Sequence, residues 1–318
     1  MKSVWILADD RMGNVNQLLG VAEALGLPCV RKDIRYTSLV RLPNCLRGRT
    51  LAGLDAPSRK SIAAPFPDVV LSAGRRSYPV ARHIKAQSGG KTRIVHLMNP
   101  GRCGFREADL IVLPAHDAYR GAARNVMVVT GTPHRMTAEK IKASRKKWMP
   151  VFADYPHPRV SLIVGGATKD RPFTPAMARD LALGVQALNP ASVLATTSRR
   201  TPPAVVACLK EHLPQPFFLH RFGDTGENPY FGLLSCADII VVTGDSMSMC
   251  SECCAAGVPV FVFAPPAMTG TKHRRFHADL YARGLAAPLG APAVRPKAAL
   301  NPAADIAARI ATLLRRKP

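Results

Sequence analysis

Residues 237–263 read ADIIVVTGDSMSMCSECCAAGVPVFVF, and this stretch decides the predicted fold. Residues 238–242 and 258–263 are apolar runs of the kind that buried parallel strands use. Between them, a polar turn at residues 243–246 leads into a helix-compatible segment that ends at Gly257, a residue typical of helix C-termini. The sequence therefore predicts strand, turn, short helix and strand, which is the repeating unit of an α/β fold.

The turn before the short predicted helix is a candidate anion site. A helix N-terminus presents unpaired backbone N–H groups and the positive end of the helix dipole, which together favour a phosphate. Ser246, Ser248 and Ser251 add hydroxyl groups, and Glu252 can reach a ribose or sugar hydroxyl. A capped helix without a ligand, with Asp245 or Ser246 as the N-cap, explains the same residues equally well.

Length and composition indicate a folded protein of two ordinary domains. The chain has 318 residues, of which 47% are hydrophobic, so wholesale disorder is not expected. It holds no apolar run of the ~18 residues that a membrane-spanning helix needs, and its first residues already resemble a strand rather than a secretory signal. We therefore expect a cytoplasmic protein.

Charge is the extreme feature of the composition. Lys and Arg number 44 against 21 Asp and Glu, for a net charge of +23. This balance favours polyanionic partners, namely nucleic acid, an anionic membrane surface or phosphorylated small molecules. An arginine-rich coding bias would also produce part of it. Few aromatic residues (6%) and no nucleic-acid-binding module argue against specific nucleic-acid recognition.

The cysteine pattern favours structural thiols over a metal or redox site. The C-x-x-C at residues 250–253 lies inside the predicted helix and lacks a second pair of ligands at zinc spacing. No D-x-D-type motif stands out either, so we expect no metal site. Buried free thiols are expected at the scattered cysteines, which are Cys29, Cys45, Cys103, Cys208 and Cys236.

The first half of the chain repeats strand, loop and helix, which predicts a parallel sheet with helices on its faces. Predicted strands cover residues 4–8, 67–73, 94–98, 110–113 and 126–129. Ligands of open α/β sheets bind at the C-terminal ends of the strands. The polar side chains that follow these strands are Asp10, Asn14, Gln17, Arg75, Arg76, His116, Asp117, His134 and Arg135.

Two segments of this half differ from the repeat. Residues 30–60 interleave eight basic residues with leucines and valines, a pattern that suits peripheral attachment to anionic lipid. A solvated, irregular insertion is the alternative. Residues 150–159, PVFADYPHPR, are proline-rich and without periodicity, and we interpret them as the interdomain linker.

The second half places phosphate-compatible residues after four consecutive predicted strands or turns. No G-x-G-x-x-G opens either half, which disfavours NAD-type binding. The simplest structure is α/β: two Rossmann-like domains that face each other across a cleft, residues 1–150 and 151–318, the second with the nucleotide site and an amphipathic C-terminal helix at 303–316. The candidate donor-binding residues are Gly165, Gly166, Thr168, Lys169, Thr197, Ser198, Arg199, Arg200, Asn228, Tyr230, Thr243, Asp245, Ser246, Ser248 and Glu252.

Several motifs along the chain resemble a known family. This family is named for a plant mitochondrial-fission (elongated mitochondria) protein, and its bacterial members are usually described as glycosyltransferases. The motifs are LPNCLRGRTLAGLD (42–55), PDVVLSAGRRS (67–77), SGGKTRIVHL (88–97), the turn at 165–166, TSRRT (197–201), ENPY (227–230) and TGDSMSMCSE (243–252).

More distantly, VTGTPHR (129–135), VGGATKD (164–170) and the 243–252 motif resemble the GT-B peptidoglycan glycosyltransferase that makes lipid II. This resemblance implies GT-B architecture, and because no D-x-D-type motif stands out we expect a metal-independent mechanism. The resemblance also implies a donor diphosphate near Gly166, Thr168, Ser246 and Ser248, with the ribose near Glu252 and with Arg199 or Arg200 neutralising the leaving phosphate.

The general base is not assigned by this resemblance. Residues 9–17, DDRMGNVNQ, lack the histidine that the lipid II enzyme carries near its first loop. The catalytic candidates are Asp10, His116, Asp117 and His134, and the candidates for the acceptor side are Asn14, Gln17, Arg75, Arg76 and Arg135.

Three functions are compatible with these observations. The first is a membrane-associated GT-B glycosyltransferase that moves a sugar from a nucleotide-diphosphate donor to a lipid or saccharide acceptor of the cell envelope. On this hypothesis the nucleotide sugar is a substrate, no cofactor is needed, and the protein lies peripherally on the inner face of the membrane. The second is a non-catalytic adaptor at a membrane surface. The third is a sugar-nucleotide epimerase that uses the same donor residues.

Overall fold

The computed structural model describes residues 2–101 and 104–315, and the chain forms two compact units. Unit 1 comprises Met1–Arg135 together with Asn301–Pro318, and unit 2 is the continuous segment Met136–Leu300. Each unit is built on a six-stranded sheet with helices on both faces, so the predicted α/β class with parallel sheets is confirmed.

The sheet of unit 1 is parallel throughout, and its interior strands are buried on both faces. Parallel strands buried in this way read as continuous apolar runs, which is why the sequence predicts them well. In spatial order the strands are β2 (Cys29–Asp33), β1 (Val4–Ala8), β3 (Val69–Ala73), β4 (Arg93–Leu97), β5 (Leu110–Pro114) and β6 (Val126–Val129).

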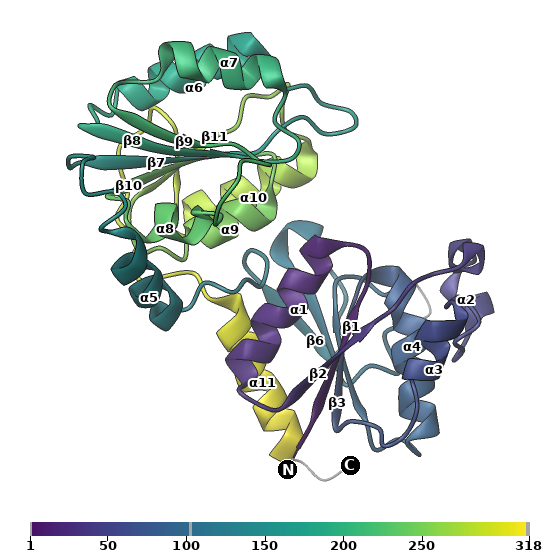
Figure 1. The fold of residues 1–318 in the computed structure, drawn as a ribbon. Coiled ribbons are helices and arrows are strands. Elements are labelled where there is room, and N and C mark those ends of the chain that lie inside the picture. The colour runs from purple at the N-terminus through teal and green to yellow at the C-terminus, as the bar shows by residue number, and fades with distance from the viewer. Residues whose placement is uncertain (1, 102–103, 316–318) are drawn as a thin grey trace. The chain divides into compact units, whose positions relative to one another are not determined.

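Helices cover both faces of this sheet (Figure 1). On one face, α1 (Met12–Leu25) and α11 (Pro302–Arg315) pack together against β1, β3 and β4. On the other face lie α4 (Gly74–Gln87) and α3 (Ala56–Ser61). Three short turns of helix complete the unit, which are η1 (Ser38–Arg41), α2 (Asn44–Arg47) and η2 (Ala115–Asp117).

The sheet of unit 2 is also parallel throughout. Its central strands β10, β7 and β8 are buried, whereas the edge strand β9 is half-buried. In spatial order the strands are β12 (Ala287–Pro288), β11 (Val260–Phe263), β10 (Ile239–Thr243), β7 (Arg159–Val164), β8 (Ser192–Thr197) and β9 (Phe217–His220).

Two helical layers enclose this second sheet. The helices α6 (Pro175–Gln186) and α7 (Pro203–His212) cover one face. The opposite face carries α5 (Ala138–Trp148), α8 (Tyr230–Ser235), α9 (Met247–Cys253) and α10 (Thr271–Ala282). The stretch 237–263 therefore forms β10, α9 and β11, as its sequence predicts.

The units do not divide where we expect from the sequence, at residue 150. The proline-rich segment 150–159 belongs to unit 2, because Phe152 is fully buried there and its ring lies 5.8 Å from Trp148 and 5.3 Å from Phe218. Helix α5 also belongs to unit 2, since Trp148 packs against Gly232 of α8. The chain instead passes between the units after Arg135 and again after Leu300.

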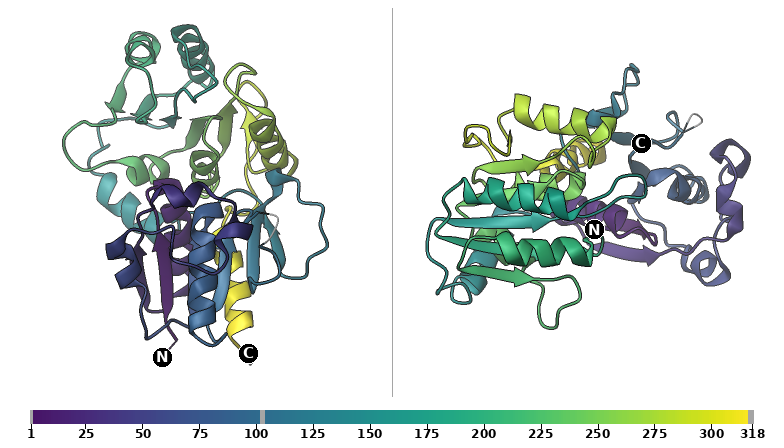
Figure 2. Two further views of the ribbon diagram at one scale, coloured as in Figure 1. Left: turned by 90° about the vertical axis from the view of Figure 1, so that its right-hand side faces the viewer. Right: turned by 90° about the horizontal axis from the view of Figure 1, so that it is seen from above.

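The C-terminal helix likewise lies in unit 1 rather than in the second domain (Figures 1 and 2). Ile306 and Ile310 of α11 are buried with Val4, Leu18 and Val21 of unit 1. The amphipathic pattern predicts the helix, but it does not identify the sheet that its apolar face covers. The last residue of the predicted helix, 316, lies outside the described residues.

Strand β2 is not predicted by the sequence, because it lies at the edge of the sheet. Four of its five residues are exposed, and CVRKD shows no apolar run. The basic segment 30–60 is therefore only partly irregular, because β2 lies at its start and α3 at its end. Two cysteines expected to be buried, Cys29 and Cys45, are exposed on this part of the chain, and Cys103 lies outside the described residues.

Candidate functional site

Asp245 joins three turns at the C-terminal edge of the unit 2 sheet. Its carboxylate accepts hydrogen bonds from the Thr243 hydroxyl (2.7 Å) and from the Gly166 N–H (3.0 Å). The Arg200 guanidinium completes the set with an ion pair at 2.7 Å. These partners come from the turns after β10, β7 and β8. A buried carboxylate requires such compensation, so Asp245 holds the three turns together.

Close packing explains the double glycine after β7. A Cβ atom at Gly165 would lie 2.2 Å from a carboxylate oxygen of Asp245, and one at Gly166 would lie 2.0 Å from the carbonyl oxygen of Arg200. Any larger residue would therefore separate the turns. The two glycines are therefore required for the packing of this edge, whether or not a phosphate binds there.

The turn after β7 uses its backbone N–H groups on the protein itself. Gly165 N–H donates to Thr243 Oγ1 (2.7 Å), Ala167 N–H to the Arg200 carbonyl (3.1 Å), and Thr168 N–H to the Arg171 carbonyl (2.9 Å). A phosphate cradle made from these N–H groups is therefore not present in this conformation. The Lys169 side chain is exposed and the Thr168 side chain half-buried, so only side-chain contacts of this turn remain predictions.

The first turn of α9 has a cap of its own. Ser246 is the N-cap residue, and its hydroxyl accepts from the Met249 N–H at 3.4 Å. Ser251 faces the protein interior, where its hydroxyl donates to the Met247 carbonyl (2.8 Å). Thr243 and Asp245, expected as donor contacts, are buried beneath the turn. Ser248 is half-buried, so it is the hydroxyl of this turn best placed for a ligand.

Glu252 on α9 is bound to Tyr230 at the start of α8. The Tyr230 hydroxyl donates to Oε2 of Glu252 at 2.5 Å, and no hydrogen bond to Oε1 is present among the described residues. Burial raises the pKa of the Glu252 carboxyl, and the Tyr230 hydrogen bond opposes this shift. Asn228 positions Tyr230, because its side-chain oxygen accepts from the Tyr230 N–H (3.0 Å).

The two arginines in the turn after β8 have different environments, although the sequence does not distinguish them. Arg200 is held by Asp245 and by the carbonyls of Gly166 and Ala167, at 3.3 and 3.1 Å. Arg199 is exposed and has no ion-pair partner among the residues that the structure describes. Of the two side chains, Arg199 is the one available to a phosphate.

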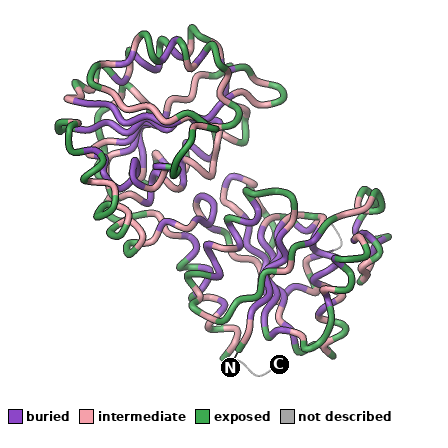
Figure 3. Tube along the Cα trace, in the orientation of Figure 1, coloured by how far each residue is buried: buried purple, intermediate pink, exposed green. Residues whose placement is uncertain are grey.

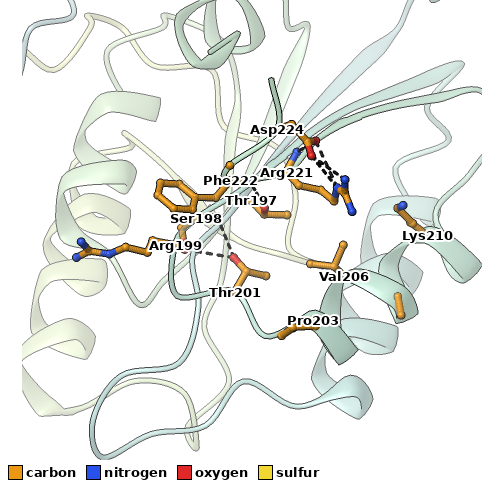
Figure 4. Close-up of a pocket in the computed structure, with 12 residues that line it drawn as sticks. Thr197, Ser198, Arg199, Thr201, Pro203, Val206, Lys210, Arg221, Phe222 and Asp224 are labelled. Carbon is orange, nitrogen blue, oxygen red and sulfur yellow. Dashed lines mark hydrogen bonds and ion pairs between the residues drawn. The ribbon is translucent and has the colours of Figure 1, made fainter. Parts of the chain in front are cut away.

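A cavity of about 530 Å³ opens beside this turn. Its lining includes Lys210, Arg221 and Phe222, which are not among the residues predicted from the sequence. In Figure 4, Arg199 extends away from the side that carries Lys210 and Arg221. Phe222 is 61% exposed, and its N–H donates to the Thr197 hydroxyl (3.0 Å). Arg221 and Phe222 follow β9 as the donor candidates follow the other strands, so their positions gave a signal, whereas Lys210 lies on α7.

His277 of α10 is a second feature that the sequence does not identify. It is buried, and its ring contacts Gly244, where a Cβ would lie 2.6 Å from Cε1. Burial lowers the pKa of His277 to about 4, with the neighbouring His273 contributing. His277 and Arg274 line a cavity of about 470 Å³ between α10 and the ends of β11 and β12.

In unit 1, Asp10 is engaged with Arg76 at the C-terminal ends of β1 and β3. Arg76 forms ion pairs with Asp9 (3.0 Å) and with Asp10, and its guanidinium stacks 4.7 Å above the Tyr36 ring. The Arg76 hydrogen bond lowers the pKa of the Asp10 carboxyl. Asp10 is therefore a carboxylate held by a cation, which makes it a weaker base.

The other acceptor-side candidates are mostly committed to the protein. Asn14 and Gln17 are buried on α1. Arg75 donates to the carbonyls of Leu42 (2.8 Å) and Val40 (3.2 Å). Arg135 pairs with Glu23 of α1, with Nε 2.8 Å from Oε1. Of this group, Arg76 forms an ion pair with a catalytic candidate, Asp10, and Arg135 follows another, His134, in the sequence.

The candidate bases lie at separate strand ends. His116 and Asp117 follow β5, which β3 and β4 separate from β1 and Asp10. His134, after β6, is buried, and its carbonyl packs against Gly20 of α1. His116 and His134 thus follow neighbouring strands, whereas β3 and β4 lie between them and Asp10, and a catalytic role for each stays a prediction.

Over residues 2–101 and 104–315, no group of three or more His, Cys, Asp or Glu side chains has the arrangement of a metal site. Over the same residues, no helix has the length and apolar character needed to span a bilayer.

The fold defines the structural class of the protein. Two Rossmann-like α/β units with parallel sheets give the chain a GT-B-type fold. Across its full length the chain is similar to a Listeria monocytogenes protein described as a UDP-N-acetylglucosamine 2-epimerase, with TM-score 0.58, 16% identity and 98% of that chain covered. It is also similar to the Neisseria meningitidis UDP-GlcNAc 2-epimerase bound to UDP-GlcNAc, with TM-score 0.51 and 14% identity over 99% of this chain and 100% of that one.

The family follows from the sequence. The family model described as Mitochondrial fission ELM1 matches residues 12–314, so the chain belongs to this family. An uncharacterized Rickettsia prowazekii protein is 26% identical over 89% of each chain. The mitochondrial fission protein ELM1 of Arabidopsis thaliana is 25% identical over 64% of this chain and 53% of its own length. The resemblance that the motifs indicate is confirmed.

Proposed function

We propose that this protein is a GT-B-type glycosyltransferase that transfers a sugar from a nucleoside-diphosphate donor to a cell-envelope acceptor. The observation that carries the proposal is the C-terminal edge of the unit 2 sheet, where Asp245 joins three turns and Ser248, Glu252 and Arg199 remain beside them. Such an edge is where α/β sheets bind nucleotides. A protein of the same fold is bound to UDP-GlcNAc, which makes uridine nucleotides the first ligands to test.

The roles follow from the chemistry of the side chains. Oε1 of Glu252 accepts from a ribose hydroxyl while Tyr230 holds Oε2 in place. Ser248 and Arg199 contact the diphosphate, and Arg199 neutralises the charge that develops as the nucleotide departs. Asp245, Thr243 and the two glycines position these groups without touching the ligand. No metal or cofactor takes part in the proposed transfer, and the base that activates the acceptor hydroxyl stays open.

The test is a set of thermal-shift titrations with UDP, GDP, ADP, CMP and TDP. A ligand that binds only the native state raises its melting temperature, and we expect this for UDP at about 150 mM salt. Glu252→Gln keeps an acceptor for Tyr230 but removes the carboxylate charge, so UDP affinity should fall by about tenfold or more. Glu211→Gln, an exposed carboxylate on α7, is the matched control.

Two results would contradict the proposal. One is the absence of a shift with every nucleotide, which favours the non-catalytic adaptor that the family name suggests. The other is a shift that inorganic phosphate reproduces, because any anion binds weakly to a chain of net charge +23.

An epimerase is the second candidate, because both solved structures compared above are described as UDP-GlcNAc 2-epimerases. Incubation of the protein with UDP-GlcNAc in the absence of an acceptor separates the two chemistries. A new sugar nucleotide in the NMR spectrum of the mixture identifies an epimerase. An unchanged donor, consumed only when envelope lipid is added, identifies a transferase.

A further inference from the structure

Residues 38–49, SLVRLPNCLRGR, which we call the leucine lobe, expose large apolar side chains next to one another in sequence. Leu39 is 47% exposed, Leu42 45% and Leu46 74%. Scattered exposed leucines are ordinary on protein surfaces, but three within eight residues form a patch that calls for a partner. The lobe comprises η1 and α2, and it is mostly green and pink in Figure 3.

The lobe is fixed to unit 1 by buried polar groups, so its exposed leucines are not the result of loose packing. The Asn44 side chain is buried and donates to the carbonyls of Arg75 and Pro100, at 2.9 Å each. Arg47 is also buried and donates to the Arg76 carbonyl (3.2 Å). Arg75 in turn holds the lobe's own carbonyls. The leucines point outward from a built support.

The charged residues of the lobe and of the segment around it in the sequence all have one sign. Residues 34–54 contain four arginines and no aspartate or glutamate. Arg47 is the buried one, while Arg35, Arg41 and Arg49 are exposed. Arg49 pairs with Glu107, which leaves Arg35 and Arg41 as the net positive charge beside the leucines.

A cavity of about 560 Å³ lies against the lobe and is lined by Arg35, Arg41 and Arg76, with Asp10 on its wall. Tyr36 and Thr37 also line it, but their hydroxyl oxygens are buried beneath its surface. The exposed guanidinium groups of Arg35 and Arg41 are donors suited to phosphate oxygens. The cavity thus offers an anion site next to an apolar patch.

We infer that the leucine lobe docks on an anionic phospholipid bilayer, with Leu39, Leu42 and Leu46 at the boundary between headgroups and acyl chains and a lipid phosphate in the adjacent cavity. Apolar side chains interleaved with arginines are the combination that binds such surfaces. The inference deepens the proposed function, because it places the bilayer beside the catalytic candidate Asp10 and the acceptor-side candidate Arg76. It rests on that function only for the identity of the acceptor, and its experiment uses no nucleotide.

The experiment is co-sedimentation of the full chain with phosphatidylcholine vesicles that contain none or about 30% phosphatidylglycerol, at about 150 mM salt. The triple variant Leu39→Ser/Leu42→Ser/Leu46→Ser should bind the anionic vesicles about tenfold more weakly. The matched control, Val128→Ser/Val151→Ser/Leu183→Ser, removes three apolar side chains that are 52%, 55% and 54% exposed elsewhere, and it should bind like the wild type.

Both triple variants keep the net charge of +23, so charge alone cannot separate them. Equal binding by the two variants would overturn the inference, as would equal binding of the wild type to neutral and anionic vesicles. Inorganic phosphate distinguishes a free-anion site from a lipid site. In this experiment both triple variants are measured in millimolar phosphate at matched ionic strength. If phosphate abolishes vesicle binding to the same extent in both, the inference is also overturned.

Two native thiols provide a second readout. Cys45 lies in the lobe, which follows the C-terminal end of β2, and Cys29 lies at the N-terminal end of that strand; both are exposed. A polarity-sensitive dye is attached at one of them, with serine at the other and at Cys103. Vesicles should blue-shift the emission of the dye at Cys45 and leave the dye at Cys29 unchanged. A shift at both positions, or only at Cys29, would contradict docking through the lobe.

Discussion

At the scale of the residue, His277 packs against the turn that carries Asp245 and helps to hold that turn in place. Its buried ring fills the space that the absent side chain of Gly244 leaves, directly under the turn that carries Asp245. The charged and titratable groups that face it are His273 on its own helix and Asp245 on the turn. Burial dominates over both, so the neutral imidazole is the form that fits.

The lowered pKa makes His277 a source of pH-dependent stability. The unfolded chain takes up a proton near the ordinary pKa of 6.5, whereas the folded chain resists protonation down to about 4. The stabilisation is therefore complete above the unfolded pKa and is lost as the pH falls. In His277→Asn, the loss of unfolding free energy between about pH 7 and about pH 5 should be smaller by about 2 kcal/mol than in the wild type. Denaturant titrations at the two pH values measure this, and equal losses would contradict it.

At the scale of the element, three parallel strands place their turns so closely that only glycine fits between them. The double glycine after β7 meets Asp245 and the Arg200 carbonyl at distances no Cβ can occupy. Each element has its own local signals, but the ion pair of Arg200 with Asp245 forms only if the turns after β7, β8 and β10 meet. The three turns at the C-terminal edge of this sheet therefore form together rather than independently.

Gly166→Ala tests this assembly. Because its Cβ would lie 2.0 Å from the Arg200 carbonyl oxygen, the turn after β8 must move, and the Arg200–Asp245 ion pair should weaken. We expect the free energy of unfolding to fall by about 3 kcal/mol. Gly13→Ala, in α1 with no atom within 4 Å of the new Cβ, is the control and should leave stability unchanged or slightly raised. A variant at Gly166 as stable as the control would show that the turns are not held together.

At the scale of the whole molecule, the two units differ in how the chain builds them. Unit 2 is continuous from Met136 to Leu300, whereas unit 1 is completed by α11 from the end of the chain. Ile306 and Ile310 bury their side chains in the core of unit 1. Each such side chain contributes about 2 kcal/mol, which together is a large share of the stability of a typical domain.

This difference predicts how fragments behave. Residues 136–300 alone should unfold cooperatively in a circular-dichroism melt. Residues 1–135 alone should lack a cooperative transition, and fusion of residues 301–315 through a flexible glycine–serine linker should restore it. Cooperative melting of 1–135 at the same temperature as the fused fragment would contradict the role of α11.

The candidate site was predictable in its residue types and less so in their roles. Strand ends with Gly, Ser, Thr and Arg identify the edge of the unit 2 sheet, because polar turns after apolar strands have a local signature. Which arginine is free and which is bound depends on Asp245, which lies 45 positions from Arg200 in the sequence. Lys210 on α7 and Arg221 and Phe222 after β9 were missed because only the tertiary structure brings α7 and the turn after β9 to one cavity.

By itself, the sequence determined the α/β class, most of the buried strands, the family and the edge of the sheet that carries the candidate site, because these depend on local apolar periodicity and short motifs. The tertiary structure alone decided that α11 completes unit 1, that residues 150–159 are core rather than linker, that β2 forms an edge, and that Thr243 and Asp245 lie beneath the site. Each of these depends on contacts between residues far apart in the chain. Apolar patterning fixes that a face is buried, and only packing selects the surface against which it is buried.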